Sequence, residues 1–457
     1  MGNSKSSTVS LRDLDLNFKE VIPALSHREA MEEANRCLYC YDAPCITACP
    51  TSIDIPKFIK KMASENLLGS AKTIMDANPI GASCARVCPT SELCEGACVL
   101  NHSTNPIMIG QLQRYATDWA IQNEQVLFKK GEKKEIKVAI VGAGPAGLST
   151  ARELARMGYE VTIFEAEEHA GGLNKYGIVS FRLPQNISDW EVEQVRSLDV
   201  QIQTNTKVGK DISAEQLLST YDRIVLAVGM SNVPNLGIEG EELNGVFDAI
   251  EFVKETKTGS VSNSLVGKKV VVIGAGNTAI DGATCSVRLG AENVKILYRR
   301  TREEMTAYDF EYDFAKQDGV EFRWLTAPQR IIGDEEGNVI GIECIKMMLG
   351  EPDQDGRRRP KPIQNSEFFL EIDAVIRAIG QERHTPLIET FKLVHSEGVV
   401  KVDSQTFQTS NPKIFACGDV MFAKGQGEAM VVTAAQQGKE VAYAIHQQSS
   451  EEVMKHG

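Results

Sequence analysis

Apolar and polar residues alternate differently in two parts of this 457-residue chain. Up to about residue 130, apolar residues recur at helical spacing, as in the run SHREAMEEANRCLYC and in the stretch from Asp54 to Met75. The apolar positions at the start of that stretch are Ile55, Phe58, Ile59 and Met62. After a charged linker at 129–135, strand-like and helix-like segments alternate. This order predicts an α-helical domain followed by a parallel α/β sheet.

The α/β part contains a near-repeat. The segment KVAIVGAG (137–144) resembles KKVVVIGAGNTAID (268–281), and each precedes an apolar segment that ends in glycine, RIVLAVG (223–229) or DAVIRAIG (373–380). A closing segment, IFACGDV (414–420), comes near the far end. We therefore predict two Rossmann-like dinucleotide-binding domains, the second inserted in the first. The predicted limits are 1–130 for the helical domain, 131–260 with 381–457 for the first nucleotide-binding domain, and 261–380 for the inserted one. Hairpin turns are expected at DEEGN (334–338) and EPDQDGRRRP (351–360).

Charge and cysteine content narrow the class of protein. The formal net charge of −13 argues against nucleic acid or an anionic membrane surface as a partner. No run approaches the roughly 18 apolar residues of a membrane helix, and the first residues lack the apolar core of a signal peptide. Eight of the 11 cysteines lie between Cys37 and Cys98, which suits metal-bound thiolates better than a secreted disulfide scaffold. We therefore expect a cytoplasmic protein.

A glycine-rich turn follows the first strand-like segment of the α/β part. It consists of Gly142, Ala143, Gly144, Pro145, Ala146 and Gly147, the G-x-G-x-x-G pattern of dinucleotide-binding folds. In this pattern the first glycine permits a tight turn, the second admits a pyrophosphate, and the third lets the helix pack on the strand. The helix N-terminus then stabilises the phosphate charge. Glu165 ends the next strand-like segment, at the distance expected of an acid that binds a ribose hydroxyl.

Two further segments make this site more specific. Gly171, Gly172 and Leu173 follow the second strand-like segment, and Gly418 and Asp419 lie near the C-terminus. The pairing resembles the two-dinucleotide flavoprotein superfamily, which implies FAD, with the glycines along its pyrophosphate and the aspartate at its ribityl chain. The alternative for the two glycines is a simple turn. Disulfide reductases of that superfamily carry a redox-active cysteine pair near the flavin. No such pair follows Leu173, so electrons need another route.

The second glycine-rich turn runs from Gly274 to Ala279, with alanine in its third position. The strand-like segment that follows ends at Arg299 and Arg300, where an NAD site usually places an acid. Two guanidinium groups suit a 2′-phosphate, so we expect NADPH rather than NADH. The alternative is that one arginine faces solvent and pairs with Glu303 or Glu304.

The clustered cysteines form two runs. The first is Cys37-x2-Cys40-x4-Cys45-x3-Cys49-Pro, and it parallels the bacterial ferredoxin run with a longer central gap. The second is Cys84-x3-Cys88-Pro-x4-Cys94-x3-Cys98. Thiolates at such spacing bind zinc or iron–sulfur clusters. A structural zinc site prefers two C-x2-C pairs, and the runs contain one. Beside a flavin and a nicotinamide site, iron–sulfur clusters are favoured, because FAD can pass on singly the electrons that a nicotinamide delivers as a pair.

The segments CLYCYDAPCITACPTSIDIPKFI, CARVCPTSELCEGAC and PIMIGQLQRYA resemble the N-terminal half of dihydropyrimidine dehydrogenase and its separate bacterial subunit. The small subunit of glutamate synthase shares the architecture without the DAPC…CPT-x-IDI wording. The resemblance implies two interleaved [4Fe-4S] clusters. The ligands implied for one cluster are Cys37, Cys40, Cys45 and Cys98, and for the other Cys49, Cys88, Cys94 and Gln113. Counting cysteines alone would place Cys84 where the resemblance places Gln113, and both assignments stay open.

The same resemblance implies further cofactor contacts. Those to FAD fall on Gly142 to Ala146, Glu165 to Leu173, Arg182, Val208, Gly418 and Asp419. Those to the nicotinamide nucleotide fall on Ala275, Gly276, Asn277, Thr278, Arg299, Arg300, Ala378, Ile379 and Gly380. A third basic residue that meets the 2′-phosphate in relatives using NADPH aligns with Thr306. Either Arg302 substitutes for it or the chain accepts NADH.

The resemblance implies an electron-input flavoprotein subunit with no catalytic residue of its own. The family's pyrimidine-reducing part is an FMN-bearing barrel, and no such segment follows His446. We therefore expect a separate FMN-containing subunit that reduces uracil or thymine with electrons from NAD(P)H. One alternative is a glutamate synthase small subunit or another NAD(P)H-oxidising flavoprotein with a different acceptor. The other is a non-enzymatic scaffold with zinc-bound cysteines.

Overall fold

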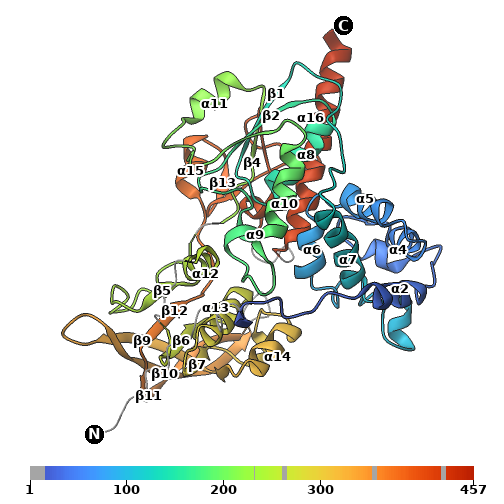
Figure 1. The fold of residues 1–457 in the computed structure, drawn as a ribbon. Coiled ribbons are helices and arrows are strands. Elements are labelled where there is room, and N and C mark those ends of the chain that lie inside the picture. Colours follow the sequence, from blue (N-terminus) through green and yellow to red (C-terminus); the bar gives the residue numbers. More distant parts are fainter. Residues whose placement is uncertain (1–15, 231, 260–264, 353–357, 424–428, 457) are drawn as a thin grey trace. The chain divides into compact units, whose positions relative to one another are not determined.

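The computed structural model describes residues 16–456, apart from 231, 260–264, 353–357 and 424–428. The described residues form two compact units (Figure 1). The smaller unit contains residues 16–20, 176–181 and 232–382, and the larger contains the others. Among the helices that the structure describes, none combines the length and the apolar character needed to cross a membrane.

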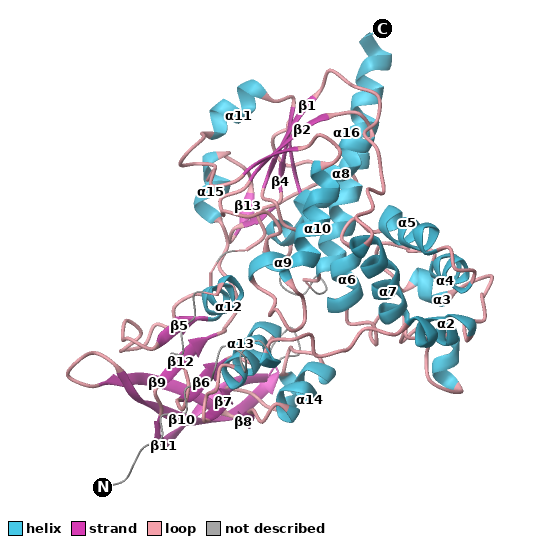
Figure 2. Cartoon of the chain, in the orientation of Figure 1, coloured by secondary structure: helices cyan, strands magenta, loops and turns pink. Residues whose placement is uncertain are grey.

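The larger unit begins with short helices that pack around an apolar core (Figure 2). In chain order they are α2 (His27–Asn35), α3 (Pro44–Thr47), α4 (Ile55–Ala63), α5 (Leu67–Ala77), α6 (Gly81–Val87), the 3-10 helix η1 (Val99–His102) and α7 (Ile109–Gln122). The four apolar side chains that the sequence placed on one face are all buried in this core. Most of the clustered cysteines lie in the connections or near the ends of these helices, whereas Cys84 lies in the middle of α6.

The amphipathic stretch from Asp54 to Met75 contains two helices, α4 and α5. The side chain of Asp54 caps α4 by accepting a hydrogen bond from the Lys57 amide at 3.2 Å. Glu65 then has a φ of +59°, which takes the chain out of the helix. The side chain of Asn66 accepts from the Gly69 amide at 2.8 Å and starts α5. The polar residues between the two helices therefore act as caps.

The second part of the larger unit is a five-stranded parallel sheet of order β15-β4-β1-β2-β3. Its strands are β1 (Lys137–Val141), β2 (Glu160–Phe164), β3 (Gln201–Gln203), β4 (Arg223–Leu226) and β15 (Ile414–Ala416). The associated helices are α8 (Pro145–Arg156), α9 (Leu173–Tyr176), α10 (Gln185–Arg196), α11 (Ala214–Thr220), α15 (Thr385–Thr390), η3 (Gly418–Met421) and α16 (Val431–His456), with a small hairpin of β13 (His395–Ser396) and β14 (Val399–Val400). Because β15 pairs with β4 across almost 190 residues, with Ile414 beside Ile224, the sheet closes only after the inserted segment, as predicted.

The smaller unit contains a second parallel sheet, of order β5-β12-β6-β7-β8. Its strands are β5 (Val246–Asp248), β6 (Lys269–Ile273), β7 (Asn293–Leu297), β8 (Glu321–Arg323) and β12 (Ala374–Arg377), and its helices are α12 (Ala249–Thr258), α13 (Asn277–Arg288), η2 (Arg302–Glu304) and α14 (Asp309–Gln317). The predicted fold class, two Rossmann-like domains after a helical domain, is therefore confirmed. The domain limits stay a proposal, since β5 precedes residue 261, where we expected the inserted domain to begin.

An antiparallel sheet of β9 (Thr326–Gly333), β10 (Val339–Pro352) and β11 (Arg358–Glu371) completes the smaller unit. The turn expected at 334–338 joins β9 to β10, and the Gly337 amide there donates to the Asp334 carbonyl at 3.1 Å. Strands β10 and β11 flank the other expected turn. Residues 353–357 of that turn lie outside the described residues.

Within the larger unit, two buried contacts join the cysteine-bearing helices to α8 and α10, the helices beside the five-stranded parallel sheet. The amide and hydroxyl of Ser83 in α6 donate to the two carboxylate oxygens of Glu191 in α10, at 2.9 and 2.5 Å. The guanidinium of Arg152 in α8 donates to the carbonyls of Met75 and Asp76 at the end of α5. Both bridging side chains are almost fully buried, at 1% exposure each.

The Glu191 contact predicts a pH-dependent stability. Burial raises the pKa of Glu191 to about 7, although the hydrogen bonds from Ser83 oppose the shift. Because the folded pKa exceeds the unfolded one, the proton's stabilising contribution is complete below about pH 4.5 and is lost as pH rises through about 7. The loss is about 3 kcal/mol for a shift of this size. A Glu191→Gln variant, which stays neutral, should lack this decline when urea unfolding is followed from about pH 5 to about pH 8. An equal decline in both proteins would contradict the assignment.

Candidate functional site

The first glycine turn connects β1 to α8. Gly142 has a φ of +102°, and a Cβ added there would lie 2.5 Å from the carbonyl oxygen of Ala227 on β4's continuation. A Cβ at Gly147 would overlap the carbonyl oxygen of Gly142. At Gly144, by contrast, a Cβ would meet only the Cα of Gly172, at 3.8 Å. The first and third glycines are therefore required by the turn and by packing, and the second leaves its face of the helix N-terminus open to a phosphate.

The residues after β2 lie against this turn. Gly172 has a φ of +56°, and a Cβ there would lie 2.7 Å from the Cα of Gly144. The amide of Gly171 donates to the carbonyl of Ala143 at 2.9 Å. Glycine is therefore needed at Gly172 because this segment approaches the first glycine turn closely, and not only because the chain changes direction there. Leu173 begins α9 directly after these glycines.

Glu165 stands beside the same turn. Its carboxylate accepts hydrogen bonds from the amides of Ala143 at 2.8 Å and Glu167 at 2.9 Å. Burial raises the pKa of this carboxyl, and the two amides oppose the shift. The carboxylate therefore lies within one residue of Gly144, where an acid that binds a ribose must lie.

The C-terminal segment reaches the sheet next to the turn. The amide of Gly418 donates to the side-chain oxygen of Gln437 at 2.9 Å, and a Cβ on Gly418 would come within 3.1 Å of the Ala146 Cβ. Burial raises the pKa of Asp419, and the nearby Arg383 opposes that shift. Gly418 therefore lies at the first turn of α8, as the predicted flavin site requires.

The two other residues expected at this site are placed differently. Val208 is buried and forms an isolated β-bridge with Ile212. Arg182 is half-buried in the chain between Phe181 and Leu183. Cys417, the residue before Gly418, is fully buried, and burial raises the pKa of its thiol to about 12. This thiol is therefore neutral at physiological pH, in keeping with a packing residue.

The second glycine turn, in the smaller unit, connects β6 to α13. Gly274 has a φ of +129°, and a Cβ there would overlap the carbonyl oxygen of Ala378. Gly276 precedes the first residue of α13, Asn277, so the helix N-terminus is open at the turn. The segment of Ala378, which includes Ile379 and Gly380, follows β12 next to β6. The structure thus brings together the residues predicted to bind a nicotinamide nucleotide at this turn.

Arg299 and Arg300 follow β7, the strand beside β6. Arg299 is exposed, and the buried Nε of Arg300 has no hydrogen-bond partner. Across the residues that the structure describes, neither arginine pairs with the acids that follow; Glu304 instead accepts a hydrogen bond from the Thr301 amide at 3.1 Å. A buried donor without a partner is costly, so Arg300 suits an anionic ligand.

The residue proposed to replace a third basic contact is already engaged. The guanidinium of Arg302 pairs with Asp309 and lies 4.3 Å from the ring centroid of Tyr312. Thr306, which aligns with that basic residue in relatives, lies beside the turn: its amide donates to the Ala275 carbonyl at 3.3 Å. A hydroxyl can donate one hydrogen bond to a phosphate but adds no charge.

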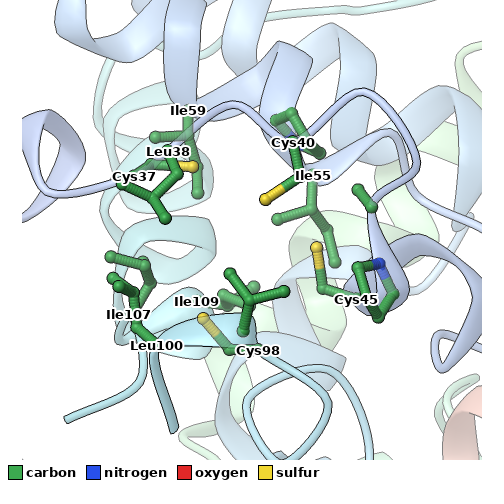
Figure 3. Close-up of a pocket in the computed structure, with 14 residues that line it drawn as sticks. Cys37, Leu38, Cys40, Cys45, Ile55, Ile59, Cys98, Leu100, Ile107 and Ile109 are labelled. Carbon is green, nitrogen blue, oxygen red and sulfur yellow. The ribbon is translucent and has the colours of Figure 1, made fainter. Parts of the chain in front are cut away.

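Four cysteines line one apolar pocket in the helical part of the larger unit. They are Cys37, Cys40, Cys45 and Cys98. Figure 3 shows their sulfur atoms around a common space, with isoleucine and leucine side chains between them. Among the described residues, no three His, Cys, Asp or Glu side chains converge on one point as a single metal ion requires. Thiolates spread around a space fit a [4Fe-4S] cluster, in which each corner iron takes its own cysteine.

Burial raises the pKa of two thiols of this pocket, Cys37 and Cys45. Burial raises the pKa of Cys45 to about 11, and the neighbouring Cys37 and Cys98 raise it further. Metal binding therefore has to displace protons, and the gain in metal–thiolate bonding has to exceed that cost.

A second group of cysteines lies deeper in the same helical part. Cys88 interacts electrostatically with Cys84, Cys94 and Cys49, and a hydrogen bond with Cys84 is the largest cause of its raised pKa, ahead of burial. The buried side chain of Gln113 in α7 donates through Nε2 to the carbonyl of Gly81 at 2.7 Å. That hydrogen bond engages the side-chain nitrogen of Gln113 and leaves its Oε1 as the atom that can bind a metal. Both Cys84 and Gln113 are therefore near this group, and the structure leaves their roles open.

Two family models match the chain. The family described as pyridine nucleotide-disulphide oxidoreductase matches residues 136–438. The family described as dihydropyrimidine dehydrogenase domain II, 4Fe-4S cluster, matches residues 15–125. These matches confirm the predicted oxidoreductase class with FAD, NAD(P)H and 4Fe-4S cofactors, without giving the number of clusters.

Curated relatives are similar over most of the chain. The NADP(+)-dependent formate dehydrogenase subunit beta of Moorella thermoacetica is 37% identical, over 89% of this chain and 60% of its own length. The glutamate synthase (NADPH) small chain of Escherichia coli is 36% identical, over 94% and 93%. The NAD-dependent dihydropyrimidine dehydrogenase subunit PreT of Escherichia coli is 35% identical, over 93% and 96%. The chain thus spans about 60% of the first relative and nearly all of the other two.

Solved structures share the fold at lower identity. Mycobacterium tuberculosis FprA in complex with NADPH superposes with a TM-score of 0.55 at 19% identity, over 70% of this chain and 86% of its own. Thioredoxin reductase of T. acidophilum superposes with a TM-score of 0.52 at 21% identity, over 69% and 99%. These likenesses support the fold of the α/β part.

The unpartnered guanidinium of Arg300 predicts a preference between the two nicotinamide nucleotides. An Arg300→Ala variant should raise the KM for NADPH by about 10- to 100-fold, because a charge-assisted hydrogen bond contributes about 1.5–3 kcal/mol. The KM for NADH should change much less, because NADH lacks the 2′-phosphate. Steady-state oxidation of both nucleotides with ferricyanide as acceptor measures this difference. Arg302→Ala is the matched control, since its guanidinium is held by Asp309. An equal loss for NADPH and NADH would refute the assignment.

Proposed function

Because this chain belongs to the pyridine nucleotide-disulphide oxidoreductase family, among relatives that are iron–sulfur flavoprotein subunits, we propose that it is the electron-input subunit of a pyrimidine-reducing enzyme. It oxidises NAD(P)H at FAD and passes electrons through two [4Fe-4S] clusters to a separate FMN-containing subunit that reduces uracil or thymine. The observation that carries this proposal is the ring of four cysteines around one apolar pocket, in the same chain as two dinucleotide turns.

In this proposal the smaller unit binds the nicotinamide nucleotide. The N-terminus of α13 after Gly276 holds the pyrophosphate, and Thr306 borders the turn. The guanidinium groups of Arg299 and Arg300 hold the 2′-phosphate, which favours NADPH. The neutral Thr306 contributes no charge there, so NADH remains a substrate of lower affinity.

The larger unit binds FAD in the same way. The N-terminus of α8 holds its pyrophosphate next to Gly144, whose open face is bordered by Gly172. Glu165 binds the ribose, and Asp419 meets the ribityl chain. Bound FAD accepts a hydride from the nicotinamide and releases its two electrons one at a time.

We propose that the cysteines bind two clusters with interleaved ligands. Cys37, Cys40, Cys45 and Cys98 bind the first. Cys49, Cys88 and Cys94 bind the second, and Gln113 is its fourth ligand through Oε1, with Cys84 as the alternative. The hydrogen bond from Gln113 Nε2 to the Gly81 carbonyl supports the first choice, because it engages the side-chain nitrogen and not Oε1. Clusters with thiolate ligands also suit the cytoplasm, where we place the protein.

The acceptor distinguishes this proposal from a second one. The glutamate synthase small chain is as similar to this chain as PreT is, at 36% against 35% identity. The family match of residues 15–125 to dihydropyrimidine dehydrogenase domain II supports the pyrimidine-reducing enzyme. The domain limits of 1–130, 131–260 with 381–457, and 261–380 belong to the same proposal.

Affinity purification of the chain from its native cell tests the acceptor. An FMN-containing partner, and NAD(P)H oxidation by the complex that depends on uracil or thymine, would support the proposal. A large amidotransferase partner with glutamate formation would establish the second candidate instead. NAD(P)H oxidation with ferricyanide by the isolated chain is the control, because it requires no partner. Its absence would contradict the electron-input role itself.

The fourth ligand of the second cluster gives a separate prediction. Purified protein should contain roughly eight iron atoms per chain if both clusters have four irons. Gln113→Ala should change the EPR spectrum of one reduced cluster, and Cys84→Ala should leave both spectra and the iron content unchanged. The reverse result would make Cys84 the ligand. Zinc without iron would refute the clusters altogether.

A further inference from the structure

Thr51 places a hydroxyl beside one of the proposed cluster ligands. Its Oγ1 lies 3.4 Å from the Sγ of Cys49, and Thr51 is 2% exposed. Cys49 is 9% exposed. Within the described part of the chain, the structure gives this hydroxyl no other hydrogen-bond partner. Between two protonated groups, either atom could donate. Once Cys49 is a metal-bound thiolate it has no proton, so the hydroxyl of Thr51 has to be the donor.

A buried positive charge, that of Lys439, lies at the end of α5. Lys439 in α16 is 9% exposed, and its ammonium donates to the carbonyl of Ala77 at the end of α5. The ammonium is close enough to Cys49 to interact with it electrostatically. Buried charges interact more strongly than exposed ones, because water screens them less.

The residues next to Lys439 belong to the flavin site. Gln437 accepts a hydrogen bond from the Gly418 amide at 2.9 Å, and the carbonyl of Gly438 accepts one from the Thr150 hydroxyl at 3.0 Å. Gln437, Gly438 and Lys439 of α16 therefore connect the segments at the first glycine turn to the end of α5.

We propose that Thr51 and Lys439 are positioning residues that raise the reduction potential of the cluster bound through Cys49, so that this cluster accepts electrons from the flavin. The proposal rests on the assignment of Cys49 as a ligand in the proposed function. One added electron makes a cluster one unit more negative. A hydrogen bond to a ligand sulfur and a nearby cation both stabilise that extra charge, and both therefore raise the potential.

The chain contains a natural comparison for Thr51. The sequence Cys-Pro-Thr occurs twice, at 49–51 and at 88–90. In the second copy the hydroxyl of Thr90 bonds the carboxylate of Glu95 rather than the sulfur of Cys88. The two threonines thus share a local sequence, and only Thr51 contacts a sulfur.

The test is an EPR-monitored redox titration of the purified full-length holoprotein. Thr51→Val, which replaces the hydroxyl by a methyl group, should lower the midpoint potential of one cluster and leave the other unchanged. We expect about a tenfold decrease in the equilibrium constant for its reduction, which is about 59 mV for one electron. Thr51→Ser should restore the wild-type potential. Thr90→Val is the matched control and should shift neither cluster.

Lys439 provides an independent variant if Thr51→Val loses its cluster. Lys439→Met should lower the potential of the same cluster, and Lys439→Arg should retain it. Unchanged potentials in Lys439→Met and in any cluster-containing Thr51→Val protein would overturn the inference. So would an equal shift in Thr90→Val. A Cys49→Ala protein that keeps both clusters and all its iron would instead refute the ligand assignment in the proposed function, which separates the two failures.

Discussion

The buried guanidinium of Arg152 is the contact that joins the cysteine-bearing helices to the first dinucleotide turn. Arg152 lies on α8, the helix that begins at this turn, and it donates to two carbonyls at the end of α5. Its charge is balanced by the adjacent Glu153, whose side chain is 3% exposed and also accepts from Tyr443 on α16 at 3.3 Å. A buried charge is tolerable only with such partners. The arginine therefore holds α8 and the end of α5 together.

At both glycine turns, a second constraint is the small space between neighbouring segments of main chain. At the flavin-type turn, Gly142, Gly147 and Gly172 lie where a Cβ would overlap or crowd the main chain. At the nicotinamide-type turn, Gly274 has the same role against Ala378. Both turns thus offer main-chain amides and helix N-termini to a nucleotide, and these are preorganised and carry no net charge. In our proposals, charged side chains serve selectivity, at Arg299 and Arg300, and the surroundings of a cluster, at Lys439.

The relatives help to separate the generic part of the enzyme from the specific part. Subunits named for formate dehydrogenase, glutamate synthase and dihydropyrimidine dehydrogenase are all similar to this chain at 35–37% identity. Their names differ in the substrate of the whole enzyme, whereas the chain belongs with them to one family of oxidoreductase subunits. In our proposal, nucleotide oxidation is the generic part and the substrate that is finally reduced depends on the partner, so the acceptor has to be identified in the native complex.

The glycine turns, the order of strands and helices and the inserted topology followed from the sequence, because G-x-G-x-x-G and alternating apolar segments depend on local backbone geometry. The spacing of the cysteines along the chain also predicted that their thiolates bind metal. Local pattern could not decide the break between α4 and α5, since Asn66 acts as a cap only where the chain turns back on the core. Nor could it bring Cys98 to Cys37, orient Gln113 towards Gly81, or place Lys439 at the end of α5. Those contacts join residues far apart in the chain, and only the packing of the helices against one another and on α8 and α16 determines them.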